Sequence, residues 1–483
     1  MKRKIALALT MAMLGTCLAG CGQVDTDTNA STEAAGTAAA ETTESEKEWY
    51  GTEDGKTITL HFWGGVQPEY GYDDLCANFN EEYKDKGLQV EYVRYVNDDN
   101  GNLQLETYLM GGGDVDLFIG YGGRAKMDKR VDSNLLLDMS GMLNDIGFNL
   151  DDELGVANMA EYHYDDGAVY GFPTKYENSR WILINEDMFK EAGLDIPYDG
   201  WTYSEFLADA EKLTHGEGQD KVYGVCWARK QSGNSILNAL DAVLGANQIY
   251  KNEEGTEVNF DNDVYRAGLN LVKETLDKGY AIPIEDEFSE DISVANTFLQ
   301  GKCAIMLGVA QMRLCMDQEN YPHDFMTALV PAPVPDDEKY NTEFYRKQIG
   351  TTGAGDLLSI SANTKYPEAS FEFAMWYLKG GMSPLVQGGR IPLWNGVNKD
   401  EVLSVLKEKA QGSIDMDSME NYLSLDTTQG VAAIKGHASS EISSAWFEEF
   451  DAMCYGKQSV DQTVQNMEKR GNELIQTELS SQK

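Results

Sequence analysis

Apolar and polar residues alternate over residues 57–63, where the chain reads Thr-Ile-Thr-Leu-His-Phe-Trp. Ile58, Leu60 and Phe62 fall on one face of this segment, so the two-residue period predicts a strand that enters a sheet. A pair of glycines follows and ends the strand.

A helical period replaces the alternation a few residues later. Apolar and aromatic side chains recur there at helical spacing: Leu75, Cys76, Phe79 and Tyr83. Gly87 closes this predicted helix, and residues 88–93 form a second apolar run with the character of a strand. The order strand, helix, strand predicts a parallel sheet covered by helices.

The same alternation of helices and strands continues to the end of the chain. Thr202 and Glu205 form a capping box at the start of an amphipathic helix, and Ser459 with Gln462 does the same for the last helix. Pro367 begins a helix so apolar that we expect it to be buried. Further strands are predicted at residues 115–119, 166–173, 181–184 and 222–225.

The N-terminus has the layout of an export signal. Lys2, Arg3 and Lys4 precede an apolar run at 5–14, which is too short to span a bilayer. The run leads to Leu18-Ala19-Gly20-Cys21, which resembles the bacterial lipobox. We therefore expect residues 1–20 to be removed as a lipoprotein signal peptide and Cys21 to carry the lipid. The alternative is that Cys21 is an ordinary residue of a plain signal peptide.

Residues 21–56 contain almost no large apolar side chains, so they predict a flexible acidic tether. No second apolar stretch is long enough to cross a membrane, so we expect attachment through the lipid alone. The localisation that follows is the extracytoplasmic face of the cell membrane.

The chain is strongly acidic, with 80 Asp and Glu against 39 Lys and Arg and a formal net charge of −41. Loss of the signal removes three cations and no acids, which brings the charge to −44. Such a field repels phosphate backbones, so nucleic acid is excluded as a partner.

Cysteine and histidine spacing gives no sign of a metal or cofactor. Five cysteines remain after Cys17 and Cys21 are set aside, widely spaced, and we expect most to be buried thiols. The five histidines are scattered, so no metal site is expected. The contexts GxSxG, HExxH, GxxxxGK[ST] and GxGxxG are missing, which removes several enzyme classes and leaves no catalytic residues to assign.

Nine segments together resemble the family 1 extracellular solute-binding proteins, the group that includes maltose-binding protein. Each is weak alone, but their number, order and spacing behind a lipobox make the set specific. They are ITLHFWGG at 58–65, GGGDVDLFIG at 111–120, DGAVYGFPTKY at 166–176, LINEDMFKEAGLDIP at 183–197, GWTYSEF at 200–206, FLQGKCAIMLG at 298–308, TTGAGDLLSISANTKYPEASFEFAMWYL at 351–378, GGRIP at 388–392 and YGKQSVDQTVQNM at 455–467.

The resemblance implies a lipid-anchored, monomeric protein that is not an enzyme. It would capture a sugar or oligosaccharide and deliver it to the permease subunits of an ABC importer. The implied fold class is α/β, with two interleaved lobes joined by a three-segment hinge, as in type II periplasmic binding proteins. No Pro/Ser-rich linker interrupts residues 57–483, which agrees with interleaved lobes.

We place the lobe boundaries and the crossings between the lobes from the same resemblance. The N-lobe is expected at 57–172 and 309–352, and the C-lobe at 173–308 and 353–483. The crossings are expected near 172–181, 308–311 and 352–356.

A sugar offers hydroxyls at its rim and C–H patches on its faces, so its site needs aromatic platforms beside hydrogen-bonding side chains. Residues at strand ends that face the cleft are the candidates. They are Trp63, Gln67, Glu69, Tyr121, Tyr176, Glu177, Asn178, Trp227, Gln311, Asp356, Arg390 and Trp394. Gln311 stands where the family usually has an aromatic residue, which puts stacking at that point in doubt.

Each candidate also has a plainer interpretation. Trp63 and Trp227 lie at strand ends, where a tryptophan often packs in the core. Arg390 is equally explained as a surface cation in an acidic chain.

Two further functions stay open at this stage. The same fold could bind a peptide, a polyamine or another solute, since Glu69, Glu177 and Asp356 would suit a cation. A surface glycoside hydrolase needs only two suitably placed carboxylates, and sequence spacing does not exclude it.

Overall fold

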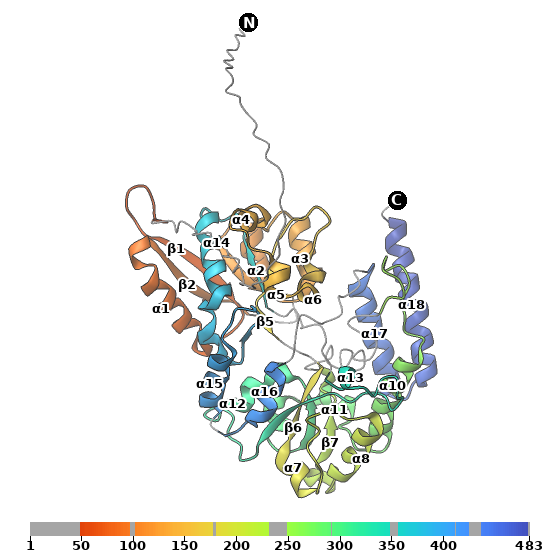
Figure 1. The fold of residues 1–483 in the computed structure, drawn as a ribbon. Coiled ribbons are helices and arrows are strands. Elements are labelled where there is room, and N and C mark those ends of the chain that lie inside the picture. Colours follow the sequence, from red (N-terminus) through yellow and green to blue (C-terminus); the bar gives the residue numbers. More distant parts are fainter. Residues whose placement is uncertain are drawn as a thin grey trace, which may run out of the picture. The chain divides into compact units, whose positions relative to one another are not determined.

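The computed structural model describes residues 49–96, 102–176, 180–230, 249–290, 292–347, 356–410, 412–424 and 436–481 (Figure 1). All of these residues belong to one compact unit, Lys47–Lys483. The predicted signal peptide, the lipidated Cys21 and most of the tether therefore lie outside the described residues, as do Glu177 and Asn178.

A five-stranded sheet forms the core of the N-lobe, with the strand order β2-β1-β3-β10-β4. β1 pairs in parallel with β2 and β3, whereas β10 pairs antiparallel with β3 and β4. The predicted inward face is confirmed, because Ile58, Leu60 and Phe62 are all buried. The strands are β1 (Ile58–Gly64), β2 (Leu88–Arg94), β3 (Leu117–Gly120), β4 (Phe172–Pro173) and β10 (Leu357–Ile360).

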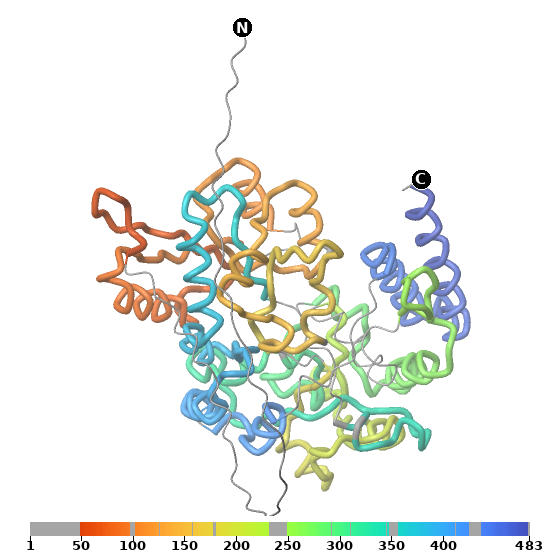
Figure 2. The backbone as a smooth tube through the Cα atoms, turned by 45° about the horizontal axis from the view of Figure 1, so that its top comes forward, coloured from red at the N-terminus to blue at the C-terminus, as the bar shows by residue number. Residues whose placement is uncertain are grey.

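Aromatic packing fastens helices to this sheet. The Phe62 ring lies 5.2 Å from that of Phe373, and the Phe79 ring lies 5.0 Å from that of Trp376. α14 thus joins α1 on the N-lobe although almost 300 residues separate them in the sequence, and both views draw α14 beside the N-terminal strands (Figure 2). The helices in this part of the molecule are α1 (Tyr72–Glu82), α2 (Leu103–Gly111), α3 (Gly123–Asp132), α4 (Ser140–Asp145), α5 (Leu150–Leu154), α6 (Val156–Met159) and α14 (Pro367–Trp376).

A four-stranded sheet forms the core of the C-lobe, with the order β7-β8-β6-β9. β6 is antiparallel to both of its neighbours, and β7 is parallel to β8. The strands are β6 (Trp181–Asn185), β7 (Tyr223–Cys226), β8 (Cys303–Leu307) and β9 (Thr327–Pro331).

Helices cover this second sheet and extend beyond it. The capping box of Thr202 and Glu205 is present at the start of α8, and Ser459 and Gln462 exchange the predicted bonds before α18. α17 packs along α18, and both contact α10 (Figure 1). The helices are α7 (Glu186–Glu191), α8 (Tyr203–Leu213), α10 (Asp263–Asp277), α11 (Ile284–Ser289), α12 (Met312–Met316), α13 (Glu343–Lys347), α15 (Lys399–Ala410), α16 (Met416–Ser424), α17 (Ser439–Cys454) and α18 (Val460–Ser481).

Short 3-10 and π-helical turns connect these elements. They are η1 (Pro68–Tyr70), η2 (Lys84–Lys86), η3 (Ala160–Tyr162), η4 (Gly218–Asp220), η5 (Val294–Phe298), η6 (Val309–Gln311), η7 (Tyr377–Gly381) and η8 (Ser383–Gly388).

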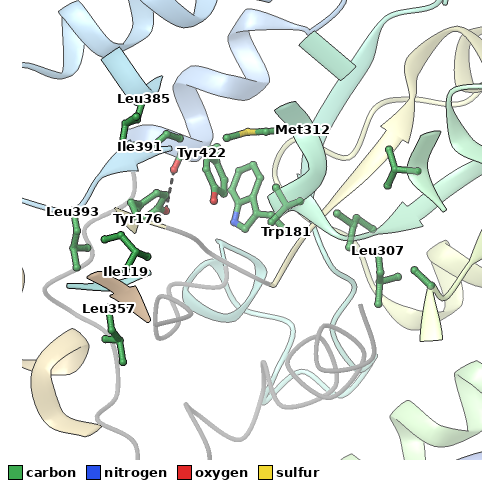
Figure 3. Packing of buried hydrophobic residues seen from close by; sticks show 14 of the residues in the cluster. Ile119, Tyr176, Trp181, Leu307, Met312, Leu357, Leu385, Ile391, Leu393 and Tyr422 are labelled. Atoms are coloured by element: carbon green, nitrogen blue, oxygen red, sulfur yellow. Dashed lines mark hydrogen bonds between the residues drawn. The ribbon is translucent and has the colours of Figure 1, made fainter. Parts of the chain in front are cut away.

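A separate two-stranded ribbon joins distant parts of the chain. β5 (Lys175–Tyr176) pairs antiparallel with β11 (Ile391–Pro392). Its Tyr176 donates a hydrogen bond from its hydroxyl to the carbonyl of Tyr422 at 3.1 Å, beside Trp181 (Figure 3). β5 follows β4 of the N-lobe sheet and precedes β6 of the C-lobe sheet, so the ribbon lies where the chain changes lobes.

Strand pairing corrects two of the expected lobe boundaries. Residues 309–352 were placed in the N-lobe, but β9 within them pairs with β6 of the C-lobe. Residues 353–483 were placed in the C-lobe, but β10 and α14 within them pack on the N-lobe sheet. A strand joins the sheet that offers it matching hydrogen bonds and an apolar face, and local sequence does not name that partner.

The expected crossing at 308–311 is also wrong, because β8 and β9 on either side of it lie in the same sheet. The chain changes sheets between β4 and β6 and again between β9 and β10. A further change follows α14, since β11 pairs with β5 and α16 then packs on β9 of the C-lobe.

Two other sequence expectations can be compared with the fold. Four of the five cysteines that follow Cys21 are buried, the exception being Cys454, and all five are free thiols, as predicted. In the part of the chain that the structure describes, no helix combines the length and the apolar character needed to cross a membrane.

Candidate ligand-binding site

A buried ion pair stands at the centre of the ribbon region. Arg390, just before β11, donates its Nε hydrogen to Asp356 Oδ2 at 2.9 Å, and Lys175 Nζ of β5 lies 3.9 Å from Asp356 Oδ1. Asp356 and Arg390 are 3% and 8% exposed. Burial by itself raises the pKa of Asp356, but the charges of Lys175 and Arg390 outweigh it and hold the pKa below its ordinary value. We call Lys175, Asp356 and Arg390 the hinge triad.

Tyrosines of the N-lobe surround the hinge triad. The Arg390 guanidinium carbon lies 6.0 Å from the ring centroid of Tyr72, and the Tyr72 ring stacks on Tyr92 at 4.2 Å. Tyr121, one residue beyond β3, accepts a hydrogen bond from the Gly65 backbone at 3.4 Å. Burial, followed by the charge of Asp356, raises the pKa of Tyr121, so its hydroxyl stays protonated and able to donate. No described residue is a hydrogen-bond partner of the buried Tyr72 hydroxyl.

The edge of the C-lobe contributes a second arginine. Arg313 on α12 donates from Nη2 to Gln311 Oε1 at 3.3 Å, and its guanidinium carbon lies 5.5 Å from the ring centroid of Tyr70. Burial and the charge of Arg390 lower the pKa of Arg313. A Cβ atom built on Gly389, whose φ of 75° is left-handed, would lie 3.0 Å from Arg313 Cβ, so the two segments are in close contact.

The hinge triad, Tyr121 and Arg313 bring together the N-lobe, the C-lobe and the strands between them. Residues 64–379, more than half of the chain, match the family described as bacterial extracellular solute-binding protein. The chain belongs to this family.

Curated relatives carry names of binding proteins. The diacetylchitobiose binding protein DasA of Streptomyces coelicolor is 22% identical over 440 residues, which is 85% of each chain. The sn-glycerol-3-phosphate-binding periplasmic protein UgpB of Salmonella typhimurium is 26% identical over 172 residues, covering 35% of this chain and only 38% of that relative.

Solved structures share the fold. A sugar transporter of Rhizobium etli in an open conformation gives a TM-score of 0.64 at 17% identity, covering 86% of this chain and 99% of that one. The GacH receptor of Streptomyces glaucescens, studied with acarbose, gives 0.63 at 16% identity, with coverage of 87% and 99%. The predicted fold class, two interleaved α/β lobes of the type II periplasmic binding kind, is confirmed.

Several predicted site residues of this solute-binding protein meet at the hinge triad. Asp356 and Arg390 are members of it. Besides burial, their charges act on the pKa of Tyr121, and Gln311 accepts a hydrogen bond from Arg313. Gln67 and Glu69 are exposed on the turn that carries Tyr70. Burial raises the pKa of Tyr70, and the charge of Glu69 adds to this effect.

Two other predicted residues lie at the ribbon but point to protein partners. Tyr176 is buried, with its ring 5.1 Å from that of Tyr422. Trp394 is partly exposed and donates its indole hydrogen to Glu153 Oε2 at 2.7 Å. It also lines a small cavity of about 170 Å³ with side chains of α15.

The structure contradicts the candidacy of Trp63 and Trp227. Trp63 is 3% exposed, and its indole donates to the Asp114 carbonyl at 2.8 Å. Trp227 is 2% exposed, and its indole donates to Thr275 Oγ1 at 2.9 Å inside the C-lobe. Each ring fills a core and each N–H already has a partner, so neither offers a platform to a ligand.

Sequence reasoning missed Lys175, Arg313 and Tyr72. Lys175 stands beside Tyr176 in a segment already assigned to a crossing, and Arg313 lies two residues after Gln311, so position alone could have suggested both. Tyr72 gives no such signal, because only the tertiary fold brings α1 to Arg390.

Proposed function

We propose that this protein captures a sugar or oligosaccharide at the hinge triad and delivers it to the membrane subunits of an ABC importer. The observation that carries the proposal is the convergence of Tyr121 of the N-lobe, Arg313 of the C-lobe and Arg390 of the ribbon region. A ligand that contacts all three binds both lobes and the hinge at once. DasA and GacH support the ligand class, because their names or descriptions state saccharide ligands.

The chemistry of the cluster suits a hydroxylated ligand. Guanidinium N–H groups donate to sugar oxygens, and phenol hydroxyls both donate and accept. Because the two tryptophans above belong to cores, stacking falls to the partly exposed rings of Tyr70 and Tyr121. Hydrogen bonds therefore carry more of the proposed recognition than the sequence suggested.

Binding would close the lobes about the hinge. A ligand held by residues of both lobes interacts more strongly with the closed state, and this difference shifts the population toward closure. The ribbon of β5 and β11 is one of the places where the chain would bend.

The family is extracellular, and we propose that this member is held at the membrane by a lipid on Cys21. The acidic tether of residues 21–56 would then let the folded part reach the importer. The mature protein would act as a monomer, since one chain supplies the whole cluster.

A cationic ligand is less well supported. That alternative needs free carboxylates, but Asp356 is already paired with Arg390 and lies near Lys175. No observation favours hydrolysis, and we propose that the protein acts as a binder.

Ligand screening tests this function. Melting temperatures of the mature protein are measured with a panel of neutral monosaccharides and oligosaccharides, and hits are followed by calorimetry and small-angle scattering. We expect a stabilising sugar that also reduces the radius of gyration. Release of hydrolysis products would instead identify an enzyme. Stabilisation by peptides or polyamines, with none by sugars, would show that the ligand is not a sugar.

A further inference from the structure

Arg313 has no ion pair in the described part of this acidic chain. Other arginines are held by carboxylates, including Arg130 by Glu106 at 2.6 Å and Arg229 by Asp451 at 2.7 Å. Among the described residues, the only side-chain hydrogen bond of Arg313 is the one to Gln311. Arg313 is partly buried, and most of its N–H groups are not bonded to described residues, although the protein has a net charge of −41. These N–H groups are therefore available to a ligand.

Arg390, which is only 8% exposed, also has N–H groups that no described residue accepts. Its Nε is bonded to Asp356, but its two terminal nitrogens make no hydrogen bond with the described residues. The two arginines lie on neighbouring segments, since a Cβ atom added to Gly389 beside Arg390 would lie 3.0 Å from Arg313 Cβ, and the Arg390 charge lowers the pKa of Arg313 after burial does. Both keep terminal N–H groups that no described residue accepts. Guanidinium groups bind carboxylates and phosphates through two parallel hydrogen bonds, which suits free terminal nitrogens.

The nearby carboxylates do not satisfy this pair. Asp356 is shared between Arg390 and Lys175. Burial and Arg390 lower the pKa of Arg313, and the charge of Asp317 offsets part of this effect without forming an ion pair with Arg313. The Asp317 oxygens accept hydrogen bonds from Asn320. Glu69 is exposed on the turn of Tyr70 and forms no ion pair with a described residue. Arg390 and Arg313 are both positively charged and repel each other, which together with burial lowers the pKa of Arg313. An anion placed between them would relieve this repulsion.

We propose that the ligand is a sugar or polyol that carries an anionic group, a carboxylate or a phosphate, held between Arg313 and the terminal nitrogens of Arg390. This inference rests on the proposed function, because it takes the hinge triad and its neighbours as the ligand site. The anionic group would bind the two arginines, while the hydroxyls would face Tyr121 and Gln311.

Matched ligand pairs test the charge. Binding of galactose is compared with galacturonate, and glucose with glucose 6-phosphate, by calorimetry on the mature protein at low and high NaCl. Inorganic phosphate and acetate serve as bare anions. We expect the anionic member of at least one pair to bind about tenfold more tightly or better, because hydrogen bonds between charged groups are the strong ones. Added salt should reduce this preference.

Variants locate the effect. Arg313→Gln should lower the preference for the anionic member about tenfold, and Arg313→Lys should fall between the two because it keeps the charge but loses the paired donors. Arg266→Gln on α10 is the control, since it makes the same chemical change at an arginine that is paired with Asp261 and Asp461. Thermal unfolding without ligand shows whether each variant is folded.

The outcomes separate the two proposals. Neutral sugars that bind as tightly as anionic ones, with Arg313→Gln unchanged, would overturn the anionic ligand and leave the sugar-binding function in place. Binding of inorganic phosphate or acetate without any sugar would overturn the sugar and keep the anion site. Failure of every anionic probe to bind would overturn this inference whatever the neutral sugars do.

Discussion

Arg390 Nε donates to Asp356 Oδ2 at 2.9 Å, and these two residues stand immediately before β11 and β10. With Lys175 of β5 nearby, the hinge triad ties together three segments at which the chain changes its sheet partners. The ion pair therefore serves the structure of the hinge as well as the proposed ligand.

Asp356→Asn should destabilise the ligand-free protein. The change leaves the Arg390 charge buried without its partner, which costs about 3 to 5 kcal/mol when one member of a buried pair is removed. Urea unfolding measures the loss, with Asp145→Asn at an exposed position of α4 as the control. An unchanged midpoint would show that the pair contributes little.

The same variant has a defined pH signature. The folded pKa of Asp356 lies below its ordinary value of 3.8, so its charge stabilises the fold above that pH. This contribution is lost as the pH falls through the folded pKa. The stability difference between wild type and Asp356→Asn should thus shrink below pH 3.8 and stay constant at neutral pH.

Trp227→Ala should damage folding and leave recognition intact. The indole is buried, bonded to Thr275 and 5.7 Å from the ring of Phe206, so its removal leaves a large cavity at a cost of about 3 to 5 kcal/mol. Chemical unfolding tests this, and Trp227→Phe, which keeps an aromatic ring, should lose less. If Trp227→Ala has normal stability but no longer binds ligand, Trp227 belongs to the ligand-binding site.

Tyr121→Phe should weaken ligand binding with little effect on the fold. Within the described ranges its hydroxyl accepts one long bond of 3.4 Å, from Gly65, so the proposed ligand is the main partner that the change removes. We expect a loss of about 0.5 to 1.5 kcal/mol in calorimetric affinity. Tyr108→Phe, on the exposed side of α2, is the matched control. Equal affinities for both variants would place the Tyr121 hydroxyl outside the site.

Glu287 should make stability fall as the pH rises. Burial raises its pKa from 4.5 to about 7, against the smaller opposing effect of hydrogen bonds from the Lys230 and Arg229 backbone. The folded state thus holds this proton more tightly than the unfolded chain, and the contribution is fully present below pH 4.5 and lost by about pH 7.

Glu287→Gln should therefore match wild type near pH 4 and exceed it at pH 8 by on the order of 1 to 3 kcal/mol. Unfolding curves across this range measure the difference. Glu285→Gln, exposed on the same helix, should show no such trend. A constant difference across the range would mean that Glu287 titrates normally.

Cys21→Ala should abolish membrane attachment, because the tether has no membrane affinity of its own. Fractionation of cells that express the variant should yield an unprocessed or released chain. Recovery of a fully processed, membrane-retained variant would contradict lipidation at Cys21.

Local pattern was enough for the elements and for part of the site. The alternation of Ile58, Leu60 and Phe62 specified a strand and its buried face, and Thr202 with Glu205 marked the start of a helix. Both signals depend on neighbours within a few residues, so the sequence carries them directly. Asp356 was predicted because it follows an expected crossing, and Arg390 because it lies in the Gly-rich motif at 388–392.

Tertiary structure alone decided which sheet each strand joined and which way the strand-end aromatics turned. β9 and β10 look alike as apolar runs, yet one pairs with β6 and the other with β3. Trp63 lies near the end of β1 and Tyr121 follows β3, but the Trp63 indole bonds the Asp114 carbonyl whereas Tyr121 lies near the charges of the hinge triad. The reason is physical: strand partners and the direction of a side chain are set by contacts with segments tens or hundreds of residues away, and local periodicity carries no information about them.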